Sequence, residues 1–147
     1  MKQGLPEGLV IEKIVPEILE EKNIELLDEC LKCFTDIPEN FLAQIIQFVL
    51  SCNKKVFRYN PKKPLVEGAP EELLPSGRIY LLDKLLSRRY RDILLLPYIR
   101  LYLSIDESIS LLKYFIFMLS HNGHKFPSLN PVKTEEKILE WAGLLID

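Results

Sequence analysis

The sequence predicts an all-α fold, arranged as an irregular α-solenoid or helical bundle of six to seven helices. Apolar residues recur at helical spacing, and helix-start signals precede several of these stretches. No stretch alternates apolar and polar residues as a half-buried strand does. The chain has 147 residues, of which 48% are hydrophobic and 27% charged, which is enough for a sizeable core. We therefore expect a single helical domain over residues 1–147.

The first two helices are predicted from a proline and an asparagine. Pro16 suits the first turn of a helix, and the apolar segment 9–14 leads into it. Asn23 is a typical N-cap, so a helix is expected over residues 24–34. The apolar residues of that helix share one stripe, formed by Ile24, Leu27, Leu31 and Phe34.

The next helix follows the sequence Asp36-Ile-Pro-Glu39. Asp36 is expected to cap it, with Pro38 in its first turn and Glu39 completing the capping box. The helix runs to about Cys52 and is predicted to bury Phe41, Leu42, Ile45, Ile46, Phe48, Val49 and Leu50. Residues 53–76 contain four prolines and are predicted to form a Pro-rich internal loop, with one short turn at 70–74.

Helical spacing resumes at residues 79–86, and the basic segment 88–91 is expected to be a junction. A further helix is predicted over 92–103, in which Pro97 kinks or restarts the helix. Ser104 and Glu107 then have the spacing of a capping box, in which each side chain bonds the other's backbone N–H.

The helix that begins at Ser104 is apolar almost all round, since Lys113 is its only charge between Leu111 and Leu119. A helix of this kind must be covered on most sides by other elements. It is therefore predicted to be the core of the domain, with Leu112, Phe115, Ile116 and Leu119 nearly fully buried.

The last helix is expected after a loop. Asn122-Gly123 predicts the end of the preceding helix, and Pro127 and Pro131 are expected in the loop. Thr134 is expected to cap a helix through Trp141. Residues 144–146 continue the helical period without a stop signal, so residues 1–147 are interpreted as a fragment of a longer protein.

Charge is distributed unevenly along the chain. The net charge is −6 over residues 1–51, +6 over 52–91 and −2 over 92–147. A basic middle segment can dock an acidic protein or RNA, although solvated helix faces also differ in sign without any function. The residues expected to bind a partner are Lys54, Lys55, Arg58, Arg88, Arg89 and Arg91.

Cysteines and histidines give no convincing metal site. Cys30-x-x-Cys33 and His121-x-x-His124 form a Cys2His2 set only formally, because the cysteines lie within a predicted helix and 88 residues separate Cys33 from His121. No nucleophile motif, phosphate-binding glycine loop or acidic cluster accompanies the histidines. We therefore expect no catalytic residues, no metal and no cofactor. The odd number of cysteines, three, is typical of reduced thiols in the nucleus or cytosol.

Membrane insertion is not expected. The longest uncharged run in the first half of the chain, Phe41–Asn53, is shorter than the ~20 residues that a bilayer-spanning helix needs. The N-terminal residues lack the apolar core of a signal peptide.

Three segments carry a family resemblance. They are Phe34-Thr-Asp-Ile-Pro-Glu-Asn40, Ser108-Ile-Ser-Leu-Leu-Lys-Tyr-Phe115, and Lys137-Ile-Leu-Glu-Trp-Ala-Gly-Leu-Leu-Ile-Asp147. Together they resemble the C-terminal region of the nucleolar protein 11 family, and the likeness covers essentially the whole chain. It lies in packing segments and not in an active-site motif, so it carries over no catalytic residues.

The resemblance implies a location and a role. Members of that family look like a β-propeller region followed by a helical region, and they act in the nucleolus. There they belong to the transcription-linked subcomplex of the small-subunit processome, which acts on pre-ribosomal RNA. The expected role is a non-catalytic assembly module that contacts other subunits of the subcomplex, without a membrane or a small-molecule substrate. The alternative is a helical module that binds pre-rRNA through the basic segment 54–91.

Overall fold

Seven α-helices and no strands make up the part of the chain that the computed structural model describes, which is residues 7–34, 36–52, 76–120 and 129–146. The helices are α1 (Glu7–Glu21), α2 (Ile24–Cys33), α3 (Glu39–Ser51), α4 (Ser76–Leu86), α5 (Asp92–Tyr102), α6 (Ile105–Ser120) and α7 (Pro131–Ile146). The predicted all-α fold is confirmed. The predicted loop 53–76, except Ser76, and the predicted helix stop at Asn122-Gly123 lie outside the described residues. None of the described helices is long and apolar enough to cross a membrane.

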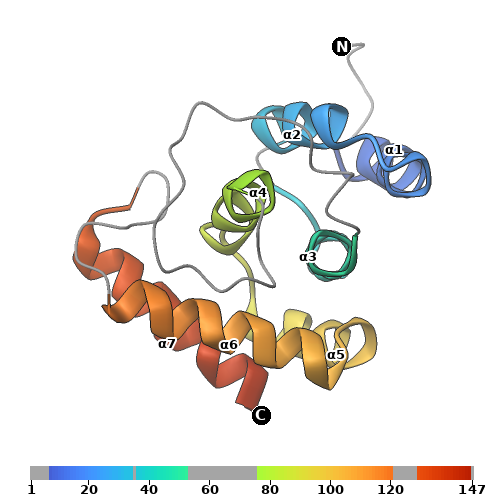
Figure 1. Cartoon of the computed structure of the whole chain (residues 1–147). Coiled ribbons are helices and arrows are strands. Elements are labelled where there is room, and N and C mark those ends of the chain that lie inside the picture. Colours follow the sequence, from blue (N-terminus) through green and yellow to red (C-terminus); the bar gives the residue numbers. More distant parts are fainter. Residues whose placement is uncertain (1–6, 35, 53–75, 121–128, 147) are drawn as a thin grey trace.

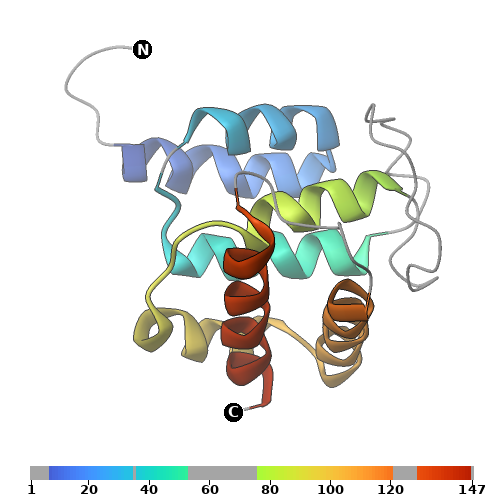
Figure 2. The same ribbon diagram turned by 90° about the vertical axis from the view of Figure 1, so that its left-hand side faces the viewer.

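The helices are stacked in three layers. Figure 1 shows α1 and α2 on one side, α3 and α4 in the middle, and α5 to α7 on the other side. In Figure 2, α7 stands across the stack and reaches from α4 to the level of α5 and α6. The middle helix α3 contacts α1, α4, α5 and α6, so it joins the two outer layers.

Helix α4 is buried although it is rich in charge. Ile79, Leu81, Leu82, Leu85 and Leu86 point into the core, and Asp83 is buried with them. A helix that is apolar on several sides packs in the interior. The charged groups on such a helix need partners, because burying an unpaired charge costs several kcal/mol.

Polar contacts connect α4 to its neighbours. Lys84 Nζ lies 2.5 Å from the buried carboxylate of Asp28 on α2. Arg78 donates to the Cys52 carbonyl at the end of α3, at 2.5 Å. The buried hydroxyl of Tyr114 on α6 donates to Asp83. Burial and the nearby Asp83 raise the pKa of Tyr114, so the phenol keeps the proton that it donates.

Two further contacts bind the ends of helices to one another. The indole N–H of Trp141 on α7 donates to the Leu86 carbonyl at the end of α4, at 2.8 Å. Just after α4, the guanidinium of Arg88 donates to the carbonyls of Leu31, at 2.9 Å, and of Phe34. These carbonyls belong to the last turn and the C-cap of α2, where a helix lacks internal donors.

The caps predicted at Asn23 and Ser104 are confirmed. The Asn23 side chain accepts from the Leu26 N–H at 3.1 Å. The Ser104 hydroxyl accepts from the Glu107 N–H at 3.1 Å, and Glu107 accepts from the Ser104 N–H at 2.9 Å. Both signals are local in sequence, so no distant packing decides them.

The helices predicted to begin at Glu39 and Asp92 do begin there, but the predicted start of α1 and the predicted N-cap of α3 are wrong. Helix α1 begins at Glu7 and continues through Pro16. The carbonyl that loses its N–H partner belongs to Glu12, which is exposed, so the missing bond leaves no buried group behind. The N-cap of α3 is Pro38, without a side-chain cap bond, and not Asp36.

The start of α7 also differs from the prediction. Asn130 caps α7 by accepting from the Lys133 N–H at 2.8 Å, and Pro131 takes the first helical position, which suits its fixed φ. Thr134 lies buried within the helix. The predicted cap at Thr134 is therefore wrong, because Asn130 and Pro131 start the helix four residues earlier.

The predicted burial of α6 is only partly right. Phe115 is buried, at 2% exposed, but Ile116 is 65% exposed and Leu119 is 47% exposed. Leu112 is half-buried, and the residues that do point inward are Leu111, Tyr114, Phe115, Phe117 and Met118. Helix α6 is apolar on both faces, so its sequence does not reveal which face packs. The bond from Tyr114 to the buried Asp83 fixes that choice.

Replacing neighbouring residues on α6 tests this orientation. Phe115→Ala should lower the free energy of unfolding by roughly 3–5 kcal/mol, because it leaves a cavity. Ile116→Ala should cost less than about 1 kcal/mol, because that side chain is mostly exposed. Urea melts of the two variants measure both losses, and equal losses would contradict the orientation.

Replacing neighbouring arginines tests the contact with α2. Arg88→Ala should lower the free energy of unfolding by about 1–3 kcal/mol, since it removes the donors to two helix-end carbonyls. Arg89→Ala is the matched control and should change it by less than about 0.5 kcal/mol, because Arg89 is exposed. Thermal melts followed by circular dichroism compare the stability of the two variants. An Arg88→Ala variant as stable as the wild-type protein would show that the contact contributes nothing to stability.

Candidate functional site

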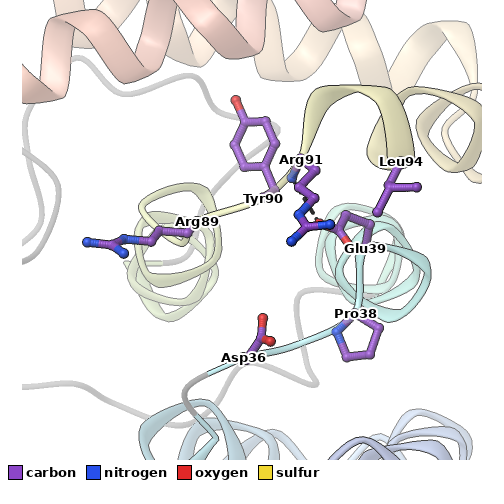
Figure 3. A pocket seen from close by; sticks show the side chains of 7 residues that line it. All are labelled: Asp36, Pro38, Glu39, Arg89, Tyr90, Arg91 and Leu94. Carbon is purple, nitrogen blue, oxygen red and sulfur yellow. Dashed lines mark hydrogen bonds between the residues drawn. The ribbon is translucent and has the colours of Figure 1, made fainter.

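A groove of about 440 Å³ lies where two connecting segments meet. One segment joins α2 to α3, and the other, residues 87–91, joins α4 to α5. The side chains that line the groove are Asp36, Pro38, Glu39, Arg89, Tyr90, Arg91 and Leu94 (Figure 3). The basic junction predicted at residues 88–91 is therefore a real break between helices, and it borders a concave surface.

The wall of the groove is held by contacts on both sides. The backbone N–H of Arg91 donates to the carboxylate of Glu39 at 2.9 Å, which ties the start of α5 to the start of α3. The ring of Tyr90 packs against Trp141, with 4.7 Å between ring centroids. The ammonium of Lys137 lies 4.2 Å from the centre of the Tyr90 ring. The backbone of Arg91 and the side chain of Tyr90 thus hold the junction, residues 87–91, in place.

The charges in the groove are balanced. Arg89 and Arg91 are exposed, and the carboxylates of Asp36 and Glu39 lie on the same surface. In Figure 3 the side chain of Arg89 extends away from that of Arg91, so the two guanidiniums do not form one compact cluster. Leu94 adds a half-exposed apolar side chain. A surface of this composition suits a protein segment that carries both charges and an apolar residue.

The six predicted partner-binding residues lie in different parts of the chain and have different surroundings. Lys54, Lys55 and Arg58 lie outside the described residues. Arg89 and Arg91 line the groove, whereas Arg88 turns inward to the end of α2. Sequence reasoning missed the contribution of Asp36, Glu39 and Leu94, because the two connecting segments are about 50 residues apart in the chain. It treated Asp36 and Glu39 only as capping residues.

Cysteine and histidine give no metal site in the described part of the chain. No group of three or more metal-ligating side chains lies together among those residues. Cys30 and Cys33 lie on α2, as predicted, and burial raises the pKa of the Cys30 thiol. Burial likewise raises the pKa of Cys52, so both thiols stay protonated at neutral pH. His121 and His124 lie outside the described residues.

Comparison with known proteins bears on the whole chain. A search of curated proteins found no match. A family model described as the nucleolar protein 11 C-terminal domain matches residues 1–147, which is the entire sequence. This agrees with the resemblance of the segments that begin at Phe34, Ser108 and Lys137. The chain therefore belongs to the nucleolar protein 11 C-terminal domain family, a family of nucleolar proteins that act in ribosome biogenesis and not a known family of enzymes.

Proposed function

We propose that this chain is a non-catalytic assembly module that binds other protein subunits of the transcription-linked subcomplex of the small-subunit processome. The observation that carries the proposal is the groove beside Arg89 and Arg91, which combines balanced charge with an exposed leucine. Interfaces between proteins are built from such mixtures, with charged rims around apolar contacts. Membership of a nucleolar ribosome-biogenesis family supplies the cellular setting.

The alternative is binding of pre-rRNA through the basic segment 54–91, and the described part of that segment, residues 76–91, does not favour it. Lys84 pairs with Asp28, and Arg78 and Arg88 donate to carbonyls at the ends of α3 and α2. Among the described residues of that segment, Arg89 and Arg91 are the basic side chains left exposed, and two carboxylates lie beside them. An RNA backbone needs a groove with excess positive charge.

Charge reversal in the groove tests the proposal. The double variant Arg89→Glu/Arg91→Glu should reduce co-precipitation of the other subcomplex subunits about fivefold, because two rim charges then oppose the partner. The fold should survive, since the bond from Arg91 to Glu39 uses the backbone N–H. Circular dichroism checks the fold, and quantitative co-precipitation with the full-length protein measures association.

The matched control reverses the charge of two exposed lysines that do not line the groove, in the double variant Lys13→Glu/Lys22→Glu. Lys13 lies on α1 and Lys22 directly follows it. This control should leave association unchanged. Unchanged subunit binding by the arginine variant would remove the groove from the interface. Loss of pre-rRNA with full retention of the protein subunits would favour the RNA-binding alternative, because phosphate contacts depend on these same charges.

A further inference from the structure

Helix α7 presents an apolar stripe to solvent. Val132, Leu139 and Ile146 are 67%, 58% and 75% exposed, and they repeat at intervals of seven residues along the helix. A seven-residue repeat places them on one face, in the pattern of a helix that packs lengthwise against another helix. Together with Gly143 they form a surface that we name the α7 outer face.

The outer face cannot turn inward. The opposite side of α7 buries Thr134, Ile138, Trp141 and Leu144. The indole N–H of Trp141 is bonded to the Leu86 carbonyl, so the rotation of the helix about its own axis is set. The exposed stripe is therefore a feature of the folded domain.

Gly143 has no structural purpose within the described chain. A Cβ atom added there would meet nothing within 4 Å, and its φ lies outside the left-handed range that favours glycine. Glycine within a helix makes the helix less stable than alanine does, so a glycine at a position where a Cβ atom would fit lowers the stability of α7 without a packing reason. Close approach of another backbone is a recognised reason for glycine, and in the described chain no atom approaches this position within 4 Å.

The charges beside the stripe are mostly acidic. Glu135, Glu136 and Glu140 are exposed on α7. Lys133 lies 3.5 Å from Glu136, and Lys137, which is largely covered and lies against the Tyr90 ring, lies 3.9 Å from Glu140. Three exposed carboxylates and one exposed ammonium thus border the stripe, which favours a partner with positive charge at its edges.

We infer that the α7 outer face docks an amphipathic helix of another protein. That helix carries an apolar stripe flanked by Lys or Arg residues, and its backbone comes closest to α7 at Gly143. The inference rests on the proposed function in one respect, namely that this protein is a subunit of the same complex. A second copy of the chain fits poorly, because two acidic helices would face each other. RNA fits poorly for the same reason.

Substitution of Gly143 gives effects of opposite sign on stability and on binding. Gly143→Ala should raise the melting temperature by about 3 °C, because alanine is the better helix former. The same variant should weaken co-precipitation of its partner subunit at least about fivefold, and Gly143→Leu should abolish it, because the added side chain holds the partner backbone away. Thermal melts and quantitative co-precipitation with the full-length protein give the two readouts.

A matched pair of leucines controls for the loss of apolar surface. Leu139→Gln on the outer face should reduce partner binding, and Leu26→Gln on α2, which removes a similarly exposed leucine from the opposite layer, should not. If the wild-type protein binds subunits and Gly143→Leu binds them equally well, the inference is wrong and the proposed function stands. If the wild-type protein binds no subunit, the proposed function fails and this inference fails with it.

A photocrosslinking residue at position 139 tests the chemistry of the occupant. Benzoylphenylalanine in place of Leu139 should become joined to a segment with apolar residues three and four apart and flanking Lys or Arg, identified by mass spectrometry. Crosslinks to an acidic segment, to RNA or to a second copy of this chain would each overturn the inference.

Discussion

The fold depends on the burial of α4, a helix that carries both the centre of the core and a set of charged groups. Its apolar residues lie between the outer layers, and its polar groups reach α2, α3, α6 and α7. Burying such a helix is favourable only because each of these contacts replaces water. The position of every outer helix except α1 and α5 is therefore defined partly by a polar bond to α4 or to Arg88 just after it.

This use of charge has a consequence for function. In the described part of the basic segment, Arg78 and Arg88 donate to carbonyls inside the domain, and the groove that Arg89 and Arg91 line also contains carboxylates. Meanwhile apolar side chains remain exposed on the outer layer, including Ile116 on α6 and Leu139 on α7. A domain with internal charge pairs and exposed apolar side chains is suited to packing against other proteins.

Local signals in the sequence predicted much of this, and tertiary contacts decided the rest. The caps at Asn23 and Ser104 and the junction after Leu86 could be predicted because neighbouring residues determine them. The inward turn of Arg88 could not, because its acceptors lie more than 50 residues earlier in the chain. Likewise α6 is predicted to be the core because it is apolar almost all round, whereas the charged α4 is the more deeply buried. Two of the residues that line the groove, Arg89 and Arg91, stand out in the sequence by their charge, whereas the acidic side of the groove does not.

A double-mutant cycle on Asp28 and Lys84 tests the central role of α4 most directly. Their charged atoms are 2.5 Å apart, and the side chains are 2% and 17% exposed. Lys84→Met alone should lower the free energy of unfolding by about 3 kcal/mol because Asp28 loses its closest cation, and Asp28→Asn should recover much of that loss in the double variant. Urea melts of the four proteins should give a coupling of about 2 kcal/mol or more. A coupling energy below about 0.5 kcal/mol would show that the contact between Lys84 and Asp28 does not stabilise the fold, and would contradict the central role of α4.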